Sequence, residues 1–141
     1  MRTAAFIAIV ALVTFGACRS PLPTETVGSS DNAAVKAAFE RHADGVQVTA
    51  TGVVDRVLSD QDGPSGPHER FIVRLRDVDM TVLVEHNLSI APRVPVVVAE
   101  PVVVHGEYIW NSQGGLVHFT HHDADRSHEG GYIVYGGKRY E

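Results

Sequence analysis

The stretch VQVTATGVVDRVL, residues 46–58, shows the pattern that decides the fold class. It is rich in valine and threonine, which favour extended backbone, and it carries one interior glycine, Gly52. Glycines inside a strand mark the bulges or bends that a closing sheet needs. The stretch therefore predicts a long strand in the wall of a small barrel.

Further runs rich in valine, isoleucine, threonine and aromatic residues follow, with turn residues and no long helical pattern between them. One of them contains a second interior glycine, Gly106. It also contains Pro101, which cannot donate a hydrogen bond to a neighbouring strand, so we expect that run to bend or break there. The runs cover residues 69–76, 80–86, 95–110, 116–122 and 131–135.

The number and order of these runs predict an all-β fold, a small five- to six-stranded barrel like the oligonucleotide/oligosaccharide-binding (OB) fold. A short helix over residues 33–44 is expected before the first strand, capped by Asp31 or Asn32 and stopped by Gly45. Residues 33–141 are thus predicted to form a single domain.

The first 17 residues have the pattern of an export signal. Arg2 precedes an apolar run, Ala4 to Phe15, that is too short to span a membrane. Cys18, the sole cysteine, follows a small-residue pair and resembles the lipidated cysteine of bacterial lipoproteins. We therefore predict a signal peptide over residues 1–17, lipidation at Cys18 and a flexible tether over residues 18–32, rich in Ser, Thr, Pro and Gly.

This predicts a protein of the periplasm or cell envelope, with the membrane as a partner through its lipid anchor. Arg19, rather than Asp, after the cysteine favours the outer membrane by resemblance to known sorting signals. The alternative is a soluble secreted protein that is cut nearby, with Cys18 a stray thiol.

The charge balance argues against nucleic acid as a partner. The chain has a formal net charge of −5, and loss of residues 1–17 removes one arginine and no acid, giving −6. Binding to a phosphate backbone depends on clustered lysine and arginine, whereas the basic residues here are scattered.

The stretch GGLVHFTHHDADRSHEGG, residues 114–131, is the strongest candidate for a functional site. On an extended strand Val117 and Phe119 would face inward, which puts His118, Thr120 and His122 on the outer face and turns His121 inward at the barrel end. Imidazole and carboxylate ligands suit Zn²⁺ best among divalent metals. The predicted metal ligands at this strand end are His121, His122, Asp123, His128 and His86.

Two alternatives for the same stretch stay open. The histidines and aspartates can form a hydrogen-bond network that only satisfies loop amides. They can also do chemistry, either without a metal or as a metal-dependent hydrolase of phosphoester type, so enzymatic activity is undecided. A hydrolase needs an open coordination position and a base near the bound water, such as Glu107 or Glu129.

The outer face of the barrel gives a second hypothesis, the binding of a small or anionic envelope ligand. OB barrels bind along two neighbouring strands, often by stacking on aromatic rings. Arginines 70, 74 and 76 would point outward there and contact an anionic glycan, a carboxylate or a lipid headgroup. The predicted ligand-binding residues are His68, Arg70, Asn87, Tyr108, Trp110 and His118.

Four motifs together carry a resemblance to a bacterial family. They are GPHERFIVRL (66–75), EHNLSIAPRVP (85–95), GEYIWNSQGGLVHFTHHD (106–123) and SHEGGYIVYGGKRY (127–140). In this order they resemble domain-of-unknown-function family 3465, small exported proteins, over residues 45–141. The resemblance implies an OB-like barrel and no established activity. The chain departs from the family at VVVAEPVVVHGEY (96–108), where a Gly-Asp turn is usual before the strand, and at Ala124, where proline is usual.

The lipid anchor gives the first testable prediction. Because Cys18 is the sole cysteine and follows a small-residue pair, Cys18→Ser is expected to release the protein from the membrane fraction of expressing cells. Cell fractionation followed by immunoblotting measures this. A Ser variant that stays with the membranes as the parent does would contradict lipidation at this residue.

Overall fold

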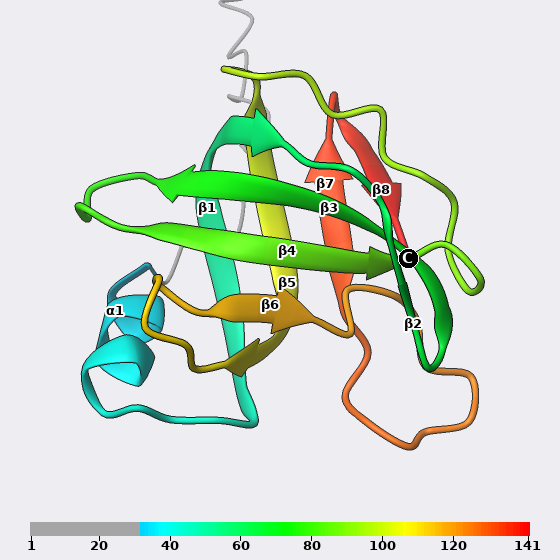
Figure 1. The fold of residues 1–141 in the computed structure, drawn as a ribbon, viewed down its shortest axis with the longest axis horizontal. Coiled ribbons are helices and arrows are strands. Elements are labelled where there is room, and N and C mark those ends of the chain that lie inside the picture. Colours follow the sequence, from blue (N-terminus) through cyan, green and yellow to red (C-terminus); the bar gives the residue numbers. More distant parts are fainter. Residues whose placement is uncertain (1–31) are drawn as a thin grey trace, which may run out of the picture.

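The computed structural model describes residues 32–141 (Figure 1). The predicted signal peptide, Cys18 and the tether up to Asp31 lie outside the described residues. No helix within residues 32–141 is both long and apolar enough to cross a membrane. The elements are α1 (Asn32–Glu40), β1 (Val46–Val57), β2 (Gln61–Gly63), β3 (Gly66–Leu75), β4 (Thr81–Asn87), β5 (Pro101–Ile109), β6 (Leu116–His118), β7 (Tyr132–Tyr135) and β8 (Lys138–Tyr140).

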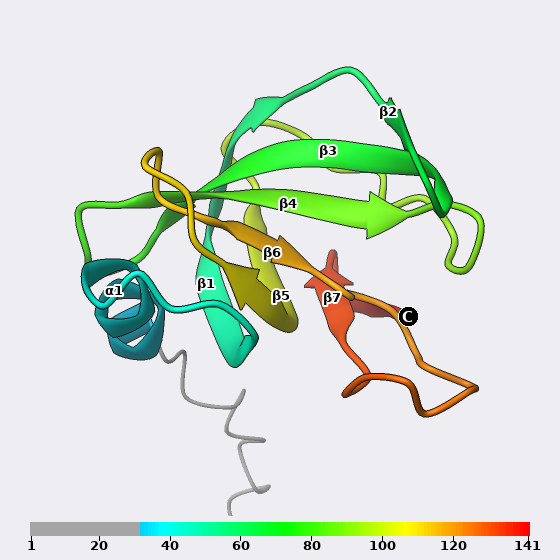
Figure 2. The same ribbon diagram turned by 60° about the horizontal axis from the view of Figure 1, so that its bottom comes forward.

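Five strands close into a barrel in the order β1-β3-β4-β6-β5, and β1 pairs with β5 to complete the circle. β4 and β6 run parallel, and the other neighbours are antiparallel. The β7–β8 hairpin extends from β5, and the short β2 pairs with β3. Figures 1 and 2 show α1 at one end of the barrel and the loop after β6 at the other. The predicted all-β, OB-like barrel is confirmed.

The two interior glycines, expected to mark bulges or bends, allow strands to approach closely, and the strand pairing shows no bulge at either of them. A Cβ atom on Gly52 would lie 2.0 Å from the carbonyl oxygen of Arg74, and one on Gly106 would lie 2.2 Å from that of His118. The bulge in β1 lies elsewhere, at Asp55, where the pairing with β3 shifts between Val54 and Arg56. Only glycine fits at positions 52 and 106, because any side chain would collide with the backbone of the neighbouring strand.

The barrel interior is built by strict alternation. On β3 the side chains of Phe71, Val73 and Leu75 are buried, as predicted, and β4 and β5 contribute every second residue in the same way. α1 covers one end with Val35 and Ala38. This packing removes a continuous apolar surface from water, which is the main stabilising contribution in a domain of this size.

The side chain of Asn32, one of the two predicted helix caps, binds to the backbone of the barrel. Its amide group donates to the carbonyl oxygens of Thr51 and Arg76 at 2.9 and 2.6 Å and accepts from the Thr51 amide at 2.9 Å. Three hydrogen bonds from one buried side chain fix the start of α1 to the barrel. The helix is also shorter than predicted and ends at Glu40.

The break expected at Pro101 is confirmed, whereas the strand boundary after His118 differs from the prediction. β5 begins at Pro101, so residues 95–100 form a loop instead of the first half of a long strand. β6 ends at His118, because Phe119 adopts a left-handed conformation (φ 50°) that breaks the strand. The short strands β2 and β8 were not predicted, since three residues are too few to show a period.

The close approach at Gly106 gives a stability prediction. Gly106→Ala places a methyl group against the backbone of β6, so we expect the free energy of unfolding to fall by about 2 kcal/mol or more. Gly63→Ala is the matched control, because its Cβ would meet nothing nearer than 3.4 Å, and its effect should stay within about 0.5 kcal/mol. Urea denaturation measures both, and equal effects would contradict the steric explanation.

Candidate functional site

The end of β6 shapes the site through one backbone irregularity. Because Phe119 has a positive φ, the alternation of the strand stops there: Phe119 lines a surface cavity, and Thr120 is fully buried. The prediction that Phe119 faces inward and Thr120 outward is therefore wrong. His121 is buried, as predicted, with 4% of its surface exposed.

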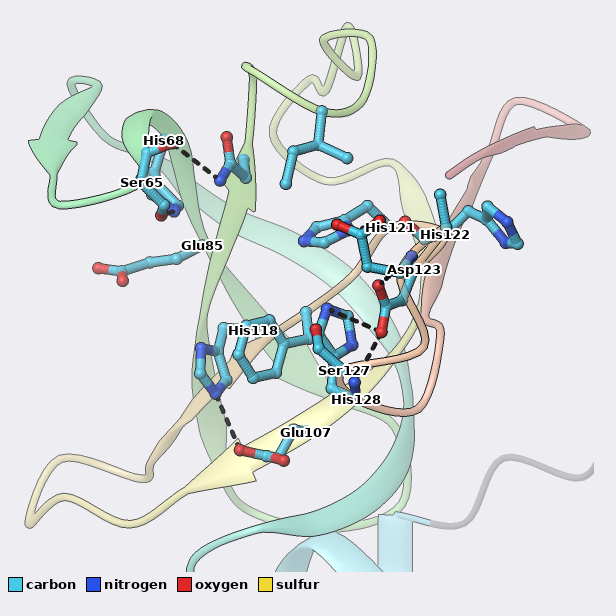
Figure 3. A pocket seen from close by; sticks show the side chains of 15 residues that line it. Ser65, His68, Glu85, Glu107, His118, His121, His122, Asp123, Ser127 and His128 are labelled. Carbon is cyan, nitrogen blue, oxygen red and sulfur yellow. Dashed lines mark hydrogen bonds and ion pairs between the residues drawn. The ribbon is translucent and has the colours of Figure 1, made fainter.

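The cavity has a volume of about 530 Å³ and lies beside the ends of β3, β4, β5 and β6 (Figure 3). The loop of residues 119–131 forms one wall of the cavity. The two ends of this loop are joined by a hydrogen bond of 2.9 Å from the Gly131 amide to the His121 carbonyl oxygen. The lining residues are Ser65, His68, Glu85, Asn87, Ile90, Glu107, His118, Phe119, His121, His122, Asp123, Ala124, Asp125, Ser127 and His128. Seven of the predicted metal- or ligand-binding residues are among them.

Phe119 is packed between two imidazole rings. Its ring centre lies 4.0 Å from that of His118 and 3.9 Å from that of His128, with interplanar angles of 22° and 9°. His121 meets the stack edge-on, with its ring centre 5.2 Å from that of His128. The ring of Phe119 therefore separates the imidazole rings of His118 and His128 and holds them in place.

Two of these histidines present an unprotonated nitrogen because of their backbone contacts. Nδ1 of His121 lies 3.0 Å from the carbonyl oxygen of His122, and Nδ1 of His128 lies 2.8 Å from that of Glu129. A carbonyl only accepts, so each neutral ring carries its proton on Nδ1 and a lone pair on Nε2. This is the tautomer in which a histidine binds a metal through Nε2.

Asp123 organises the loop. Its carboxylate accepts from the backbone amides of His128 at 2.6 Å and Asp125 at 3.0 Å, and these hydrogen bonds, the one from His128 first, lower the pKa of Asp123. One of its oxygens also lies 4.0 Å from Nε2 of His128. The carboxylate therefore stays ionised beside that imidazole.

His118 is paired with a carboxylate across the barrel wall. It lies opposite Glu107 in the β5–β6 register, and its Nε2 lies 3.2 Å from a carboxylate oxygen of that residue. Both side chains are partly exposed to the cavity. Because Nε2 donates to the carboxylate, Nδ1 of a neutral His118 carries the lone pair.

His86, a predicted metal ligand, is a buried structural residue. Nε2 donates to the carbonyl oxygen of Pro92 at 3.1 Å, and Nδ1 accepts from the Thr120 hydroxyl at 2.8 Å. Burial lowers the pKa of His86, so the ring is neutral at pH 7. With both ring nitrogens occupied, His86 has no lone pair left for a metal.

Glu69 is a second buried polar residue that the sequence analysis missed. It lies opposite His86 in the β3–β4 register, and its carboxylate accepts from the backbone amide of Val94 at 2.9 Å. Burial raises the pKa of Glu69. Its position, two residues before the inward-facing Phe71, is the signal that could have revealed it. Together Glu69 and His86 fasten the β4–β5 loop to the barrel end.

The predicted metal ligands are not gathered into one group. Within residues 32–141 no set of three or more His, Cys, Asp or Glu side chains is placed to hold a metal ion. His122 is exposed, and in Figure 3 its ring points away from His121 and His128. Of the predicted set, His121 and His128 lie together, Asp123 supports their loop, and His86 and His122 face elsewhere.

Two predicted ligand-binding aromatics belong to the barrel and not to the cavity. Tyr108 is fully buried and donates to the carbonyl oxygen of Gly114 at 3.1 Å. Trp110 packs against Phe39 of α1 and against His42 in the turn after it, with ring centres 6.5 Å and 4.2 Å apart. Tyr108 is thus part of the core, and Trp110, just after β5, packs partly buried against it.

The predicted basic stripe is largely neutralised by acidic neighbours. Nε of Arg70 lies 3.2 Å from a carboxylate oxygen of Glu85, and Arg74 lies 3.7 Å from Asp55. Arg76 is exposed beside a different cavity. These arginines do point outward, as predicted, but two of them already face a carboxylate.

The neutral state of His86 predicts how stability depends on pH. Below pH 6.5 the unfolded chain protonates this histidine and the folded chain does not, so the free energy of unfolding should fall as the pH drops through that range. Denaturation of the parent and of His86→Gln in EDTA between pH 7.5 and 5 isolates the effect. The difference between the two proteins should shrink toward low pH, and a constant difference would contradict a neutral, buried His86.

Comparison with known proteins supports the family and adds no activity. No curated protein and no solved structure shows significant similarity to the chain. The profile of the family described as "Protein of unknown function (DUF3465)" matches residues 19–141, which include the whole barrel, the histidine cavity and the β7–β8 hairpin. The chain therefore belongs to the DUF3465 family.

Proposed function

We propose that this protein is an exported, lipid-anchored envelope protein that binds a divalent transition metal in the histidine cavity, with His121 and His128 as its ligands. The observation that carries the proposal is the pair of neighbouring imidazoles whose Nδ1–H groups are both committed to backbone carbonyls. Metal-binding histidines nearly always have this outer partner, which fixes the ring and leaves Nε2 free. Export and anchoring rest on the sequence of residues 1–18.

The spacing of the two rings suits a shared ion. Two imidazoles bound at about 2.1 Å to one tetrahedral ion have ring centres about 5 Å apart. The ring centres of His121 and His128 are 5.2 Å apart. With two protein ligands, water or a small ligand would fill the remaining coordination positions.

The charge of the cavity favours a cation over the anionic ligand that the sequence suggested. Four carboxylates line it, and no lysine or arginine is among its lining residues. A phosphate or carboxylate ligand would meet unfavourable charge here, whereas a divalent ion would offset it.

The hydrolase alternative remains a prediction and gains no support from the two bases considered for it. Glu107 is engaged with His118, and the carboxylate of Glu129 lies 3.9 Å from Nε2 of His105 and is not part of the cavity lining. Binding is therefore the function that we propose.

Zinc binding tests the proposal directly. Added Zn²⁺ should raise the melting temperature of metal-free protein at pH 7.5, because zinc binds only the folded state. At pH 5 the rise should be much smaller, because protons compete with zinc for the imidazole nitrogens. Isothermal titration should show a loss of affinity of about tenfold or more for His121→Ala and for His128→Ala.

His122→Ala is the matched control, since it removes the neighbouring imidazole, which is exposed and turned away. Its zinc affinity should equal that of the parent. If His122→Ala loses as much affinity as His128→Ala, or if zinc binds none of these proteins, the proposed site is wrong.

A further inference from the structure

Three cavities follow one another along the outward face of β4, the histidine cavity first, and we call them together the groove. A second cavity of about 270 Å³ shares Ser65, His68, Glu85 and His118 with the histidine cavity and is walled by the β2–β3 turn. A third, of about 120 Å³, contains Arg70, the ion-pair partner of Glu85, and is walled by the loop between β5 and β6.

The outward face of β4 forms the floor of all three. Asn87 and Glu85 lie under the first cavity, Glu85 under the second, and Leu83 and Thr81 under the third. Six residue steps of an extended strand span about 20 Å. The three cavities therefore follow one strand in succession, an arrangement that fits a linear ligand better than a compact one.

Most of the excess negative charge of the chain is found in this groove. Five carboxylates line the three cavities, and Arg70 is the one basic side chain among the lining residues, which gives a formal charge of −4. The whole chain carries −5. Asp62 in the second cavity and Asp125 in the first are exposed, so one accessible carboxylate lies in each.

The groove also offers apolar and aromatic surface beside these carboxylates. Leu83 and Ile72 line the third cavity, and Ile90 and the ring of Phe119 line the first. Lysine and arginine side chains need this combination, because their alkyl stems pack on apolar surface while the charged ends reach acids or aromatic faces.

We propose that the groove binds an extended basic segment of a partner protein, a run of lysine or arginine residues laid along β4. Such a segment of about six residues matches the length of the floor. The proposal goes beyond metal binding and does not depend on it, since Asp62 and the third cavity lie away from His121 and His128.

Fluorescence anisotropy with labelled hexalysine at low salt, in the presence of EDTA, tests the inference. The parent should bind hexalysine and should not bind labelled hexaglutamate. The double variant Asp62→Asn/Asp125→Asn should weaken hexalysine binding by about fivefold or more, because it removes one accessible charge from each of two cavities.

The double variant Glu100→Gln/Glu141→Gln removes the same charge at exposed positions outside the groove and is the control. Equal weakening by the two double variants would mean a diffuse effect of net charge and would overturn the proposal. So would the absence of hexalysine binding, or binding of hexaglutamate with similar affinity.

A second measurement uses the unmodified protein and so does not depend on the variants folding. In an NMR titration of ¹⁵N-labelled parent with hexalysine, the shifted amides should map to residues 61–65, 81–87 and 116–128. Shifts confined to other surfaces would place the binding elsewhere and overturn the proposal. Because EDTA is present throughout, failure of the zinc titration and failure of this one are separate results.

Discussion

The structure depends on the pairing of one strand with two neighbours. β1 bonds to β5 over Val46–Val53 and to β3 over Gly52–Val57, so the same twelve residues close the barrel on both sides. This is feasible because Gly52 lets the backbone of β3 come close, and Gly106 does the same for β6 against β5. A closed barrel brings the ends of β3, β4, β5 and β6 to one place, and the histidine cavity exists because they meet there.

The polar residues at that barrel end divide into two groups with different roles. His86, Thr120 and Glu69 face inward, are buried, and use their hydrogen bonds on one another or on the β4–β5 loop. His118, His121 and His128 face the cavity and keep ring nitrogens for other partners. The first group holds the loops in place, and the second group is therefore positioned without any metal or ligand.

Alternation explains both what the sequence could predict and where it failed. The inward residues of β3 and the outward arginines follow from a period of two, whereas His121 is buried by the loop that follows β6. The same period failed at Phe119, because a non-glycine residue with φ 50° cannot be foreseen from residue type. It also misplaced Tyr108 and Trp110: Tyr108 is part of the core, and Trp110 packs partly buried against it. Which two of the clustered histidines meet depends on the loop that Asp123 folds, a tertiary contact that no local pattern shows.

The carboxylates that would favour a cationic partner also lower the stability of the folded protein. Five carboxylates on one face repel one another in the folded state, and the repulsion is only partly relieved by Arg70 and by the amides around Asp123. An unpaired lone pair on Nε2 adds a site that water must satisfy. A bound cation would reduce the repulsion between the carboxylates and give the Nε2 lone pair a partner. That cation would be a divalent ion between His121 and His128, or the side chains of a basic segment along β4. Those cations would bind only the folded barrel and would therefore stabilise it. The same carboxylates that lower the stability of the free protein would thus favour a positively charged partner.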